Sequence, residues 1–379
     1  MWTDAQLLLL IVALLYLSEC VVWLPPQAVL LLDAGRGRWR RARRTMDTGS
    51  SGKCLAFLPP WPWAVRSAVL APPGFSASPD QVTGFVAAQN GPAPRPAQPD
   101  RVLTPAEAGP ARAQLREIRV GGRLFARGAD DATAQAAVRR LRELAALPDR
   151  PAREALLKRW AEESMDPGRA AARREEVRRI ARPVEILSVV LFVWLFGIVP
   201  AAGLQLGAER ILLPVFLATP FLHVPLAVMF FRAHRRIAPA HRGEGWVELV
   251  KCLLSPPMAA RAAESLWLHA FEGFHPMALL LAGGVPGDRE ADARRELTDL
   301  AHPAFPADVP VDARACERWH REALLAGLRP RLQAAGLDPD ALLAPPPAPG
   351  PGQAVCPRCR DVLSSELSAC PACGNPLVP

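Results

Sequence analysis

The chain has 379 residues and a formal net charge of +8, with 50% apolar and 22% charged residues. This length leaves room for two or three domains, and a charged share of this size excludes a chain that lies within a membrane over its whole length. We therefore expect a mainly α-helical membrane protein in which a few spans join soluble parts. Only three of the 45 basic residues are Lys, and GC-rich Arg codons explain this bias better than an anionic partner does.

The first predicted element is a membrane anchor over residues 6–24. Residues 7–24 are apolar apart from two positions, and 18 residues of helix rise about 27 Å, close to the thickness of the hydrocarbon layer. Trp2 and Trp23 stand near the two ends, where indole rings favour the interface. No Lys or Arg precedes the run, and no small-residue cleavage site follows it. These features favour a retained anchor over a cleaved signal peptide.

Two further spans are predicted at residues 186–206 and 211–231. Only four residues separate them, so we expect a tight helical hairpin. The later span contains His223 and three prolines, whose freed carbonyl groups can be satisfied by neighbouring helices or water. A polar residue at membrane depth raises a functional hypothesis by default. Because the span 186–206 offers no charged partner, we interpret His223 as a hydrogen-bonding residue that faces the helix bundle.

Arg-rich segments at residues 35–44, 169–183 and 232–242 predict the orientation of the chain. With three spans, all of these segments lie on one side of the membrane, and the positive-inside rule places that side in the cytoplasm. We expect a multi-pass protein of the inner (cytoplasmic) membrane with its N-terminus outside and its C-terminus in the cytoplasm. Its Arg clusters would then lie beside anionic membrane lipid.

Residues 33–183 are expected to form a cytoplasmic α+β region, although the pattern leaves the fold of residues 45–113 open. Gly121 and Gly122 lie between two short apolar runs and predict a tight β-hairpin. Apolar residues then recur at helical spacing. They predict helices over residues 131–147, 152–164 and 167–182. The region contains no Gly-rich phosphate-binding motif.

Residues 232–340 are expected to form a cytoplasmic helical region. The predicted helices cover residues 246–254, 258–271, 288–300 and 311–335, with prolines between them. Trp246, Trp267 and Trp319 lie on apolar stripes, and we interpret all three as core residues. The helix over residues 246–254 follows the third span closely and is a candidate for the bilayer surface.

Two E-x-x-H motifs in this region raise the hypothesis of a metal centre. They are Glu272 with His275 and Glu317 with His320, and His269 adds a third candidate histidine. In di-iron helical bundles two such motifs supply ligands from two helices, together with two further Glu residues. Only Glu264 and Glu296 are available as guesses for those. Gly273 and Pro276 disfavour a helix at the first motif, and the charged surroundings of the second favour a solvated surface, so ordinary helix-surface residues are the simpler interpretation.

The end of the chain carries the most specific motif. After a Pro-rich linker over residues 341–355, which we expect to let the tail swing free, four cysteines follow as C-x2-C-x10-C-x2-C. They are Cys356, Cys359, Cys370 and Cys373. Two such pairs can close a tetrahedral thiolate site suited to Zn²⁺. The knuckles CPRCR and CPACG resemble those of the zinc ribbon family, although Arg360 stands where that family often has Gly.

The resemblance covers about 24 residues, 356–379, and implies a small β fold around one structural zinc ion. A segment this short buries too little apolar surface to fold without metal. Rubredoxin-like iron is the competing metal, but its knuckles are usually farther apart in sequence. The rest of the chain resembles bacterial membrane proteins of unknown role that end in a zinc ribbon.

These patterns favour a membrane-anchored zinc-ribbon protein that acts in interaction or assembly rather than as an enzyme. The ribbon would bind a protein partner, and membrane lipid would surround the spans. A membrane-bound metal-dependent enzyme that uses the E-x-x-H residues is one alternative. Nucleic-acid contact through the ribbon is another, but Arg358 and Arg360 are the only basic residues of the tail and no aromatic stacking platform accompanies them.

Overall fold

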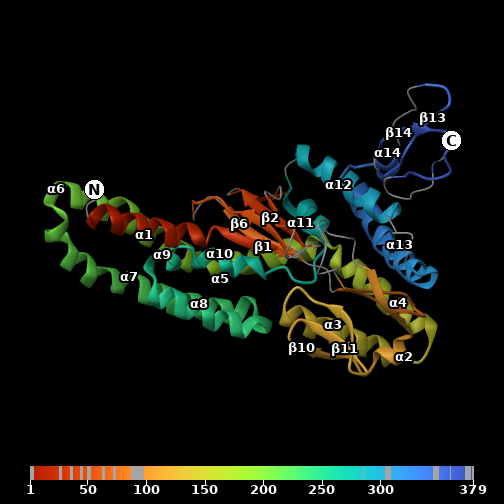
Figure 1. Cartoon of the computed structure of the whole chain (residues 1–379), viewed down its shortest axis with the longest axis horizontal. Coiled ribbons are helices and arrows are strands. Elements are labelled where there is room, and N and C mark those ends of the chain that lie inside the picture. The colour runs from red at the N-terminus through yellow and green to blue at the C-terminus, as the bar shows by residue number, and fades with distance from the viewer. Residues whose placement is uncertain are drawn as a thin grey trace.

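The computed structural model is an elongated molecule with a bundle of apolar helices at one end and the C-terminal hairpin at the other (Figure 1). It describes residues 4–24, 28–34, 37–42, 46–48, 53–61, 65–70, 74–86, 98–284, 286–303, 309–344, 350–358, 360–371 and 377. Most of these residues are helical, and the strands form small antiparallel sheets between the helices. The mainly helical character expected from the sequence is thereby confirmed.

Two long helical segments, Pro167–Leu206 and Glu209–Ile237, are long and apolar enough to cross a membrane. The first comprises α5 (Pro167–Val193), the π-helical turn η1 (Trp194–Ile198) and α6 (Val199–Leu206), and the second lies in α7 (Ala208–Ile237). Gly207 makes the turn between them with a φ of 86°, which favours glycine. The expected hairpin therefore forms.

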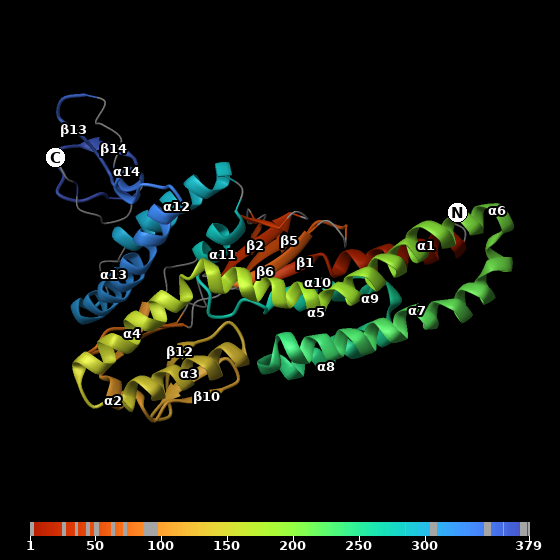
Figure 2. The same cartoon turned by 180° about the vertical axis from the view of Figure 1, so that it is seen from behind.

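The expected boundary between a cytoplasmic helix over residues 167–182 and a span over residues 186–206 is wrong. Pro183 lies inside α5, and the helix continues through it. The basic segment and the apolar segment are therefore one continuous helix, which connects the apolar end of the molecule directly to its polar end (Figure 2).

The first helix is shorter than the anchor predicted over residues 6–24. Helix α1 (Asp4–Ser18) ends at Ser18, and Val21–Leu24 form strand β1 instead, paired with β5 (Lys53–Phe57). Fifteen residues of helix rise about 22 Å, less than the hydrocarbon thickness of about 30 Å. Tyr16 packs its ring against Phe192 and Phe196, with centroid distances of 5.2 and 5.0 Å, so α1 lies along the end of α5.

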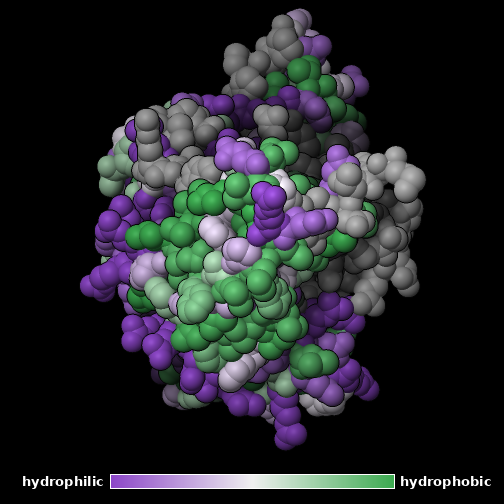
Figure 3. Space-filling model, turned by 90° about the vertical axis from the view of Figure 1, so that its left-hand side faces the viewer, coloured by the Kyte–Doolittle hydropathy of each residue, from purple (hydrophilic) through white to green (hydrophobic). Residues whose placement is uncertain are grey.

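Apolar side chains gather on the end of the molecule that holds α1, α6 and α7 (Figure 3). Hydrophilic side chains surround them at the edge of this face. Many of the apolar side chains are exposed, among them Leu14, Leu204, Phe216 and Phe221. Such a large exposed apolar surface is typical of a membrane or protein interface rather than of a free soluble protein.

The strands make five small sheets within the described residues, and every pairing is antiparallel. In spatial order they are β1-β5-β4 (Met46–Thr48), β3 (Arg38–Arg41)-β2 (Val29–Ala34)-β6 (Val65–Leu70), β7 (Phe75–Ala77)-β8 (Val82–Val86)-β9 (Gln98–Leu103), β10 (Arg112–Gln114)-β11 (Glu117–Val120)-β12 (Arg123–Arg127) and β13 (Gln353–Val355)-β14 (Val362–Ser364). Gly121 and Gly122 turn the β11–β12 hairpin with φ values of 60° and 78°, as the sequence predicts.

Helices α3 (Asp131–Ala145) and α4 (Arg150–Ser164) match two of the predicted helices within a few residues. The short helix α2 (Pro105–Ala108) precedes them, in a stretch whose fold the sequence left open. Asp130 and Asp149 cap α3 and α4, because each carboxylate accepts a backbone N–H of the first turn at 2.7 Å. Helix α3 packs on strands β10 and β11, and apolar residues of α3 and α4 share one buried cluster with Ile118 and Phe125 of the strands.

The chain after α7 is helical, as expected, but more finely divided. Its helices are η2 (Pro239–His241), α8 (Arg242–Leu254), α9 (Pro256–Ala259), α10 (Ala262–Leu268), α11 (Pro276–Gly283), α12 (Pro286–Ala301), α13 (Val311–Ala334) and α14 (Pro339–Leu343). The predicted linker over residues 341–355 begins inside α14, and residues 345–349 lie outside the described part.

Trp267 is a core residue, Trp319 is half-buried, and Trp246 is exposed, so the prediction of a buried Trp246 is wrong.

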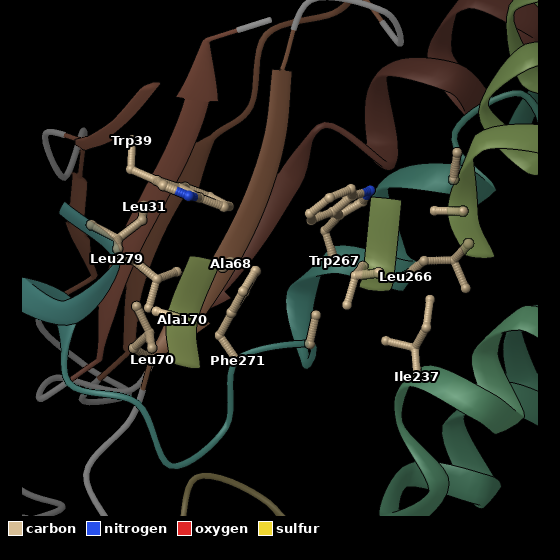
Figure 4. Close-up of a cluster of buried hydrophobic side chains, with 14 of the residues drawn as sticks. Leu31, Trp39, Ala68, Leu70, Ala170, Ile237, Leu266, Trp267, Phe271 and Leu279 are labelled. Atoms are coloured by element: carbon tan, nitrogen blue, oxygen red, sulfur yellow. The ribbon is translucent and has the colours of Figure 1, made fainter. Parts of the chain in front are cut away.

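One core joins segments from both predicted cytoplasmic regions (Figure 4). Leu31 and Trp39 from the β2–β3 pair meet Phe271 and Leu279, which follow the long helical hairpin. The rings of Trp39 and Phe271 meet edge to face, with centroids 5.4 Å apart. Residues 33–183 and 232–340 are therefore not separate in space, and side chains from both can share one site.

Candidate metal centre

The structure does not bring the ligand atoms of the two E-x-x-H motifs into one group within the described residues, although His320 lies near enough to His275 to influence its charge. Glu317 is buried, accepts a hydrogen bond from Ser76 Oγ and pairs with Arg321 Nε at 2.6 Å. The prediction that the second motif lies on a solvated surface is therefore wrong for Glu317. His275 Nε2 lies 3.4 Å from Glu296 Oε2. Because α10 ends at Leu268 and α11 begins at Pro276, the first motif lies in a turn rather than on a helix. The two-helix arrangement of a di-iron bundle is therefore not formed.

A different set of four side chains does converge, and two of the four, His269 and Glu272, are predicted candidates. His269 and Glu272 meet His241 and Asp130, and their ligand atoms all lie within 4.8 Å of one another. We call this group the His/carboxylate centre. It combines the start of α3, the end of η2 and the turn after α10, three segments that are far apart in sequence.

Local structure places each of these side chains. Asp130 is the N-cap of α3, and one of its oxygens accepts the N–H of Thr133. His241 ends the short helix η2, where its side chain is buried. His269 is the C-cap of α10, and Glu272 precedes Gly273, whose φ of 81° turns the chain toward α11.

The two imidazole rings are stacked and lie between two carboxylates. Their centroids are 3.9 Å apart and their planes differ by 24°. On one side, Glu272 Oε1 contacts His241 Nε2 and lies 3.4 Å from His269 Nδ1. On the other side, Glu244 Oε2 lies 2.9 Å from His269 Nε2 and 3.5 Å from His241 Nδ1. Each ring therefore offers one nitrogen to Glu272 and the opposite nitrogen to Glu244.

The carboxylates control the charge of the rings. Burial disfavours a positive ring, but hydrogen bonds to Glu244 and Glu272 outweigh it and raise the pKa of His241 to about 10 and that of His269 to about 9. Burial raises the pKa of Glu272, yet the contacts with both rings bring it down to about 2. Hydrogen bonds from the two rings likewise lower the pKa of Glu244. The centre thus concentrates negative charge that a cation can neutralise in place of the ring protons.

A pocket of about 290 Å³ lies beside the centre, between α8 and α10. Its lining residues are His234, Gly243, Glu244, Val247, Glu248, Ser265, Leu268 and His269. His269 belongs to both the pocket and the centre, and Glu244 lines the pocket while contacting both rings of the centre. His234 Nδ1 is buried and has no hydrogen-bond partner within the described residues, so the pocket wall keeps an unused polar group.

The cysteines of the tail are described in part. Cys356 and Cys370 are buried, and Cys359 and Cys373 lie outside the described residues. Strands β13 and β14 pair with Gln353 opposite Ser364, and the N–H of Arg360 donates to Cys356 O at 2.9 Å, which closes a tight turn. Arg360 has a φ of 62°, a conformation that favours the Gly usual there in zinc ribbons.

The tail is docked rather than free to swing. Arg358 donates to the carbonyl oxygen of His302 at 2.6 Å and pairs with Asp299 at 2.9 Å. These contacts hold the hairpin against the end of α12, which corrects the expectation of a swinging tail (Figure 1).

His223 has the local role expected of it: its Nδ1 lies 3.1 Å from Thr219 O, within α7.

The sequence patterns missed Asp130, His241 and Glu244. In the sequence Asp130 has the pattern of a helix N-cap, and it is also the N-cap of α3 in the structure, so nothing in its surroundings indicated a second role. His241 lies in the Arg-rich segment 232–242, where its neighbours point to membrane orientation rather than chemistry. A useful signal was the density of histidine, since His234, His241 and His269 account for three of only seven in the chain.

Comparison with protein-family models, with curated proteins and with solved structures gives no match.

Proposed function

We propose that this chain is a membrane-anchored metalloenzyme whose His/carboxylate centre binds one divalent first-row metal ion. The observation that carries the proposal is the convergence of Asp130, His241, His269 and Glu272 within 4.8 Å. Imidazole nitrogen and carboxylate oxygen suit Mn²⁺, Fe²⁺ and Zn²⁺. In a six-coordinate ion such as Mn²⁺ or Fe²⁺, these four ligands leave two positions for water or substrate.

Glu244 gives this centre a feature expected of a catalytic site. It contacts the ring nitrogens opposite to those that face Glu272, and such outer carboxylates orient histidine ligands and raise their basicity. It also lines the pocket, where its carboxylate is within reach of a molecule bound beside the centre. A divalent ion held by this centre would activate water for hydrolysis, and Glu244 would be a carboxylate placed to exchange protons beside it, so we assign metal-assisted hydrolysis to the pocket.

The remaining parts of the proposal follow from the sequence patterns. The three apolar helices α1, α5–α6 and α7 anchor the chain, and the N-terminal end of α1 lies near α6 in both views (Figures 1 and 2). With the Arg-rich segments in the cytoplasm, the His/carboxylate centre and the tail face the cytoplasm. The tail holds a structural zinc ion on Cys356, Cys359, Cys370 and Cys373, a proposal supported by the buried Cys356 and Cys370 beside a two-stranded hairpin.

A second candidate is an assembly protein in which both metal sites are structural. The docking of Arg358 on α12 favours it, because the ribbon already serves there to hold parts of one chain together. The two candidates differ at the pocket. A purely structural centre does not need a cavity lined by Glu244 and by a His234 whose Nδ1 has no hydrogen-bond partner among the described residues.

Metal analysis of the purified full-length chain tests the proposal. We expect two metal ions per chain, with one lost in a Cys356→Ser, Cys370→Ser variant and a different one lost in a His241→Asn, His269→Asn variant. His275→Asn is the matched control, because His275 is also partly buried but lies outside the centre. The proposal fails if the His241→Asn, His269→Asn variant retains the same metals in the same amounts as the unaltered chain.

A further inference from the structure

Helix α8 exposes a continuous apolar stripe. Trp246, Val247, Val250, Leu253 and Leu254 recur at helical spacing, and each exposes between 41% and 80% of its surface. No described segment of the chain covers this stripe. Five large exposed apolar side chains in one row need an apolar partner, since leaving them in water costs free energy.

The position of the stripe along α7 indicates what that partner is. The rings of Trp246 and Phe231 lie 4.5 Å apart, and α8 runs back beside α7 in both views (Figures 1 and 2). From Trp246 to Leu254 the helix advances about 12 Å toward the apolar end of the molecule. It therefore reaches the level of Val224 and Val228, the last exposed apolar residues of α7. The stripe continues the apolar surface of the proposed membrane segment and, by that continuity, faces lipid chains rather than a soluble protein.

The pocket adjoins this stripe. Gly243, Glu244, Val247 and Glu248 line the pocket from α8, and Val247 also belongs to the stripe. At 100° per residue the two sets occupy neighbouring faces of the same helix. A molecule bound in the pocket can therefore extend along the stripe without crossing water, provided that its extension is apolar.

The size of the pocket limits what it can hold. Its volume of about 290 Å³ corresponds to about ten water molecules at ~30 Å³ each. This space accommodates a polar head group but not a long acyl chain. Ser265, Glu244 and His269 supply polar groups to the lining, and Val247 belongs both to the lining and to the stripe.

From these observations we infer that the pocket takes the head group of a membrane-borne amphiphile whose acyl chain lies along α8. The inference deepens the proposed function, on which it rests for the chemistry, by assigning the substrate class: an amphiphile that presents a hydrolysable bond near its head group. The His/carboxylate centre then meets its substrate at the membrane surface rather than from solution.

Photo-crosslinking in lipid vesicles tests the inference with a defined probe. The full-length chain is reconstituted in phosphatidylcholine vesicles with a lysophosphatidylcholine that carries a diazirine next to its head group. We expect crosslinks in residues 243–248 and 265–269, identified by mass spectrometry, and no competition from glycerophosphocholine, which has the head group alone. A Val247→Glu, Val250→Glu variant should lose at least fivefold in crosslinking at these residues.

Val311→Glu serves as the matched control, because Val311 is also highly exposed but lies on α13, away from the pocket. Equal zinc content and equal thermal melting show that each variant is folded. Crosslinks that are absent from the pocket, or that persist unchanged in the Val247→Glu, Val250→Glu variant, overturn the inference. Metal content is measured on the same samples, so pocket crosslinks without a metal at the centre would reject the proposed function and leave the amphiphile site standing.

Discussion

The substitution Glu244→Gln isolates the contribution of the outer carboxylate to metal binding. Glutamine keeps the size and shape of the side chain but removes its charge. Glu244 touches neither Asp130 nor Glu272 in any described contact, so the change leaves the proposed ligands in place. Any loss of metal affinity therefore comes from the two rings that Glu244 orients.

The geometry fixes the expected size of this loss. Of the two contacts, only the one to His269 Nε2, at 2.9 Å, has ordinary hydrogen-bond length, whereas the one to His241 Nδ1 is long at 3.5 Å. A hydrogen bond to a charged group contributes about 1.5–3 kcal/mol, and loss of an outer carboxylate lowers metal affinity about 10- to 100-fold. Because the Glu244 side chain is 47% exposed, we expect about a tenfold loss, at the lower end of this range.

Competition with a metal chelator measures this change directly on the purified chain. The ribbon metal gives a separate signal, which should stay constant. Glu248→Gln is the control, because Glu248 lines the same pocket from the next turn but pairs with Lys251 at 2.8 Å. An affinity within twofold of the unaltered chain for Glu244→Gln, or an equal loss for Glu248→Gln, would refute the assignment of Glu244 as the outer carboxylate.

Three further predictions test other parts of the structure. Burial, together with the nearby Arg41 and His320, lowers the pKa of His275 to about 3, below an unfolded value of about 6.5. The stability that this residue contributes is therefore complete above pH 6.5 and falls by about 2 kcal/mol at pH 5. The variant His275→Asn, which can still cap α11, should abolish this part of the acid sensitivity in thermal melts at pH 8 and pH 5. Arg360→Gly should strengthen zinc retention by the tail, by about 1 kcal/mol in chelator competition, because it relieves a left-handed backbone; unchanged or weaker retention would count against the ribbon turn. Trp39→Ala should destabilise the chain by about 3–5 kcal/mol in denaturant unfolding, whereas Trp61→Ala, at an exposed site, should cost far less; similar losses would contradict the shared core.

Much of the secondary structure was predictable because it depends on local patterns. The Gly121-Gly122 turn, the capped helices α3 and α4, and the helical hairpin around Gly207 all follow from short-range rules. The errors lie where tertiary contacts decide the outcome. Residues 21–24 are as apolar as the helix before them, yet pairing with β5 makes them a strand, and the sequence holds no local sign of a partner 30 residues away.

The candidate site was predictable only in part, for a similar reason. His269 and Glu272 stood out because they are close in sequence. Asp130 and His241 join them only after the core between the first sheets and the later helices has formed. Each also has an ordinary local explanation, as a helix cap and as part of an Arg-rich flank. Their convergence is a property of the tertiary fold, and a single sequence carries no pairing signal that could predict it.

The central claim, a metal ion on two imidazoles and two carboxylates, is tested most directly by X-ray absorption at the metal edge. The Cys356→Ser, Cys370→Ser variant is the sample of choice, because it removes the competing thiolate site. The account predicts one bound metal with nitrogen and oxygen neighbours at about 2.0–2.2 Å, outer-sphere scattering from imidazole and no sulfur. Sulfur neighbours at about 2.3 Å, or no bound metal in this variant, would contradict it.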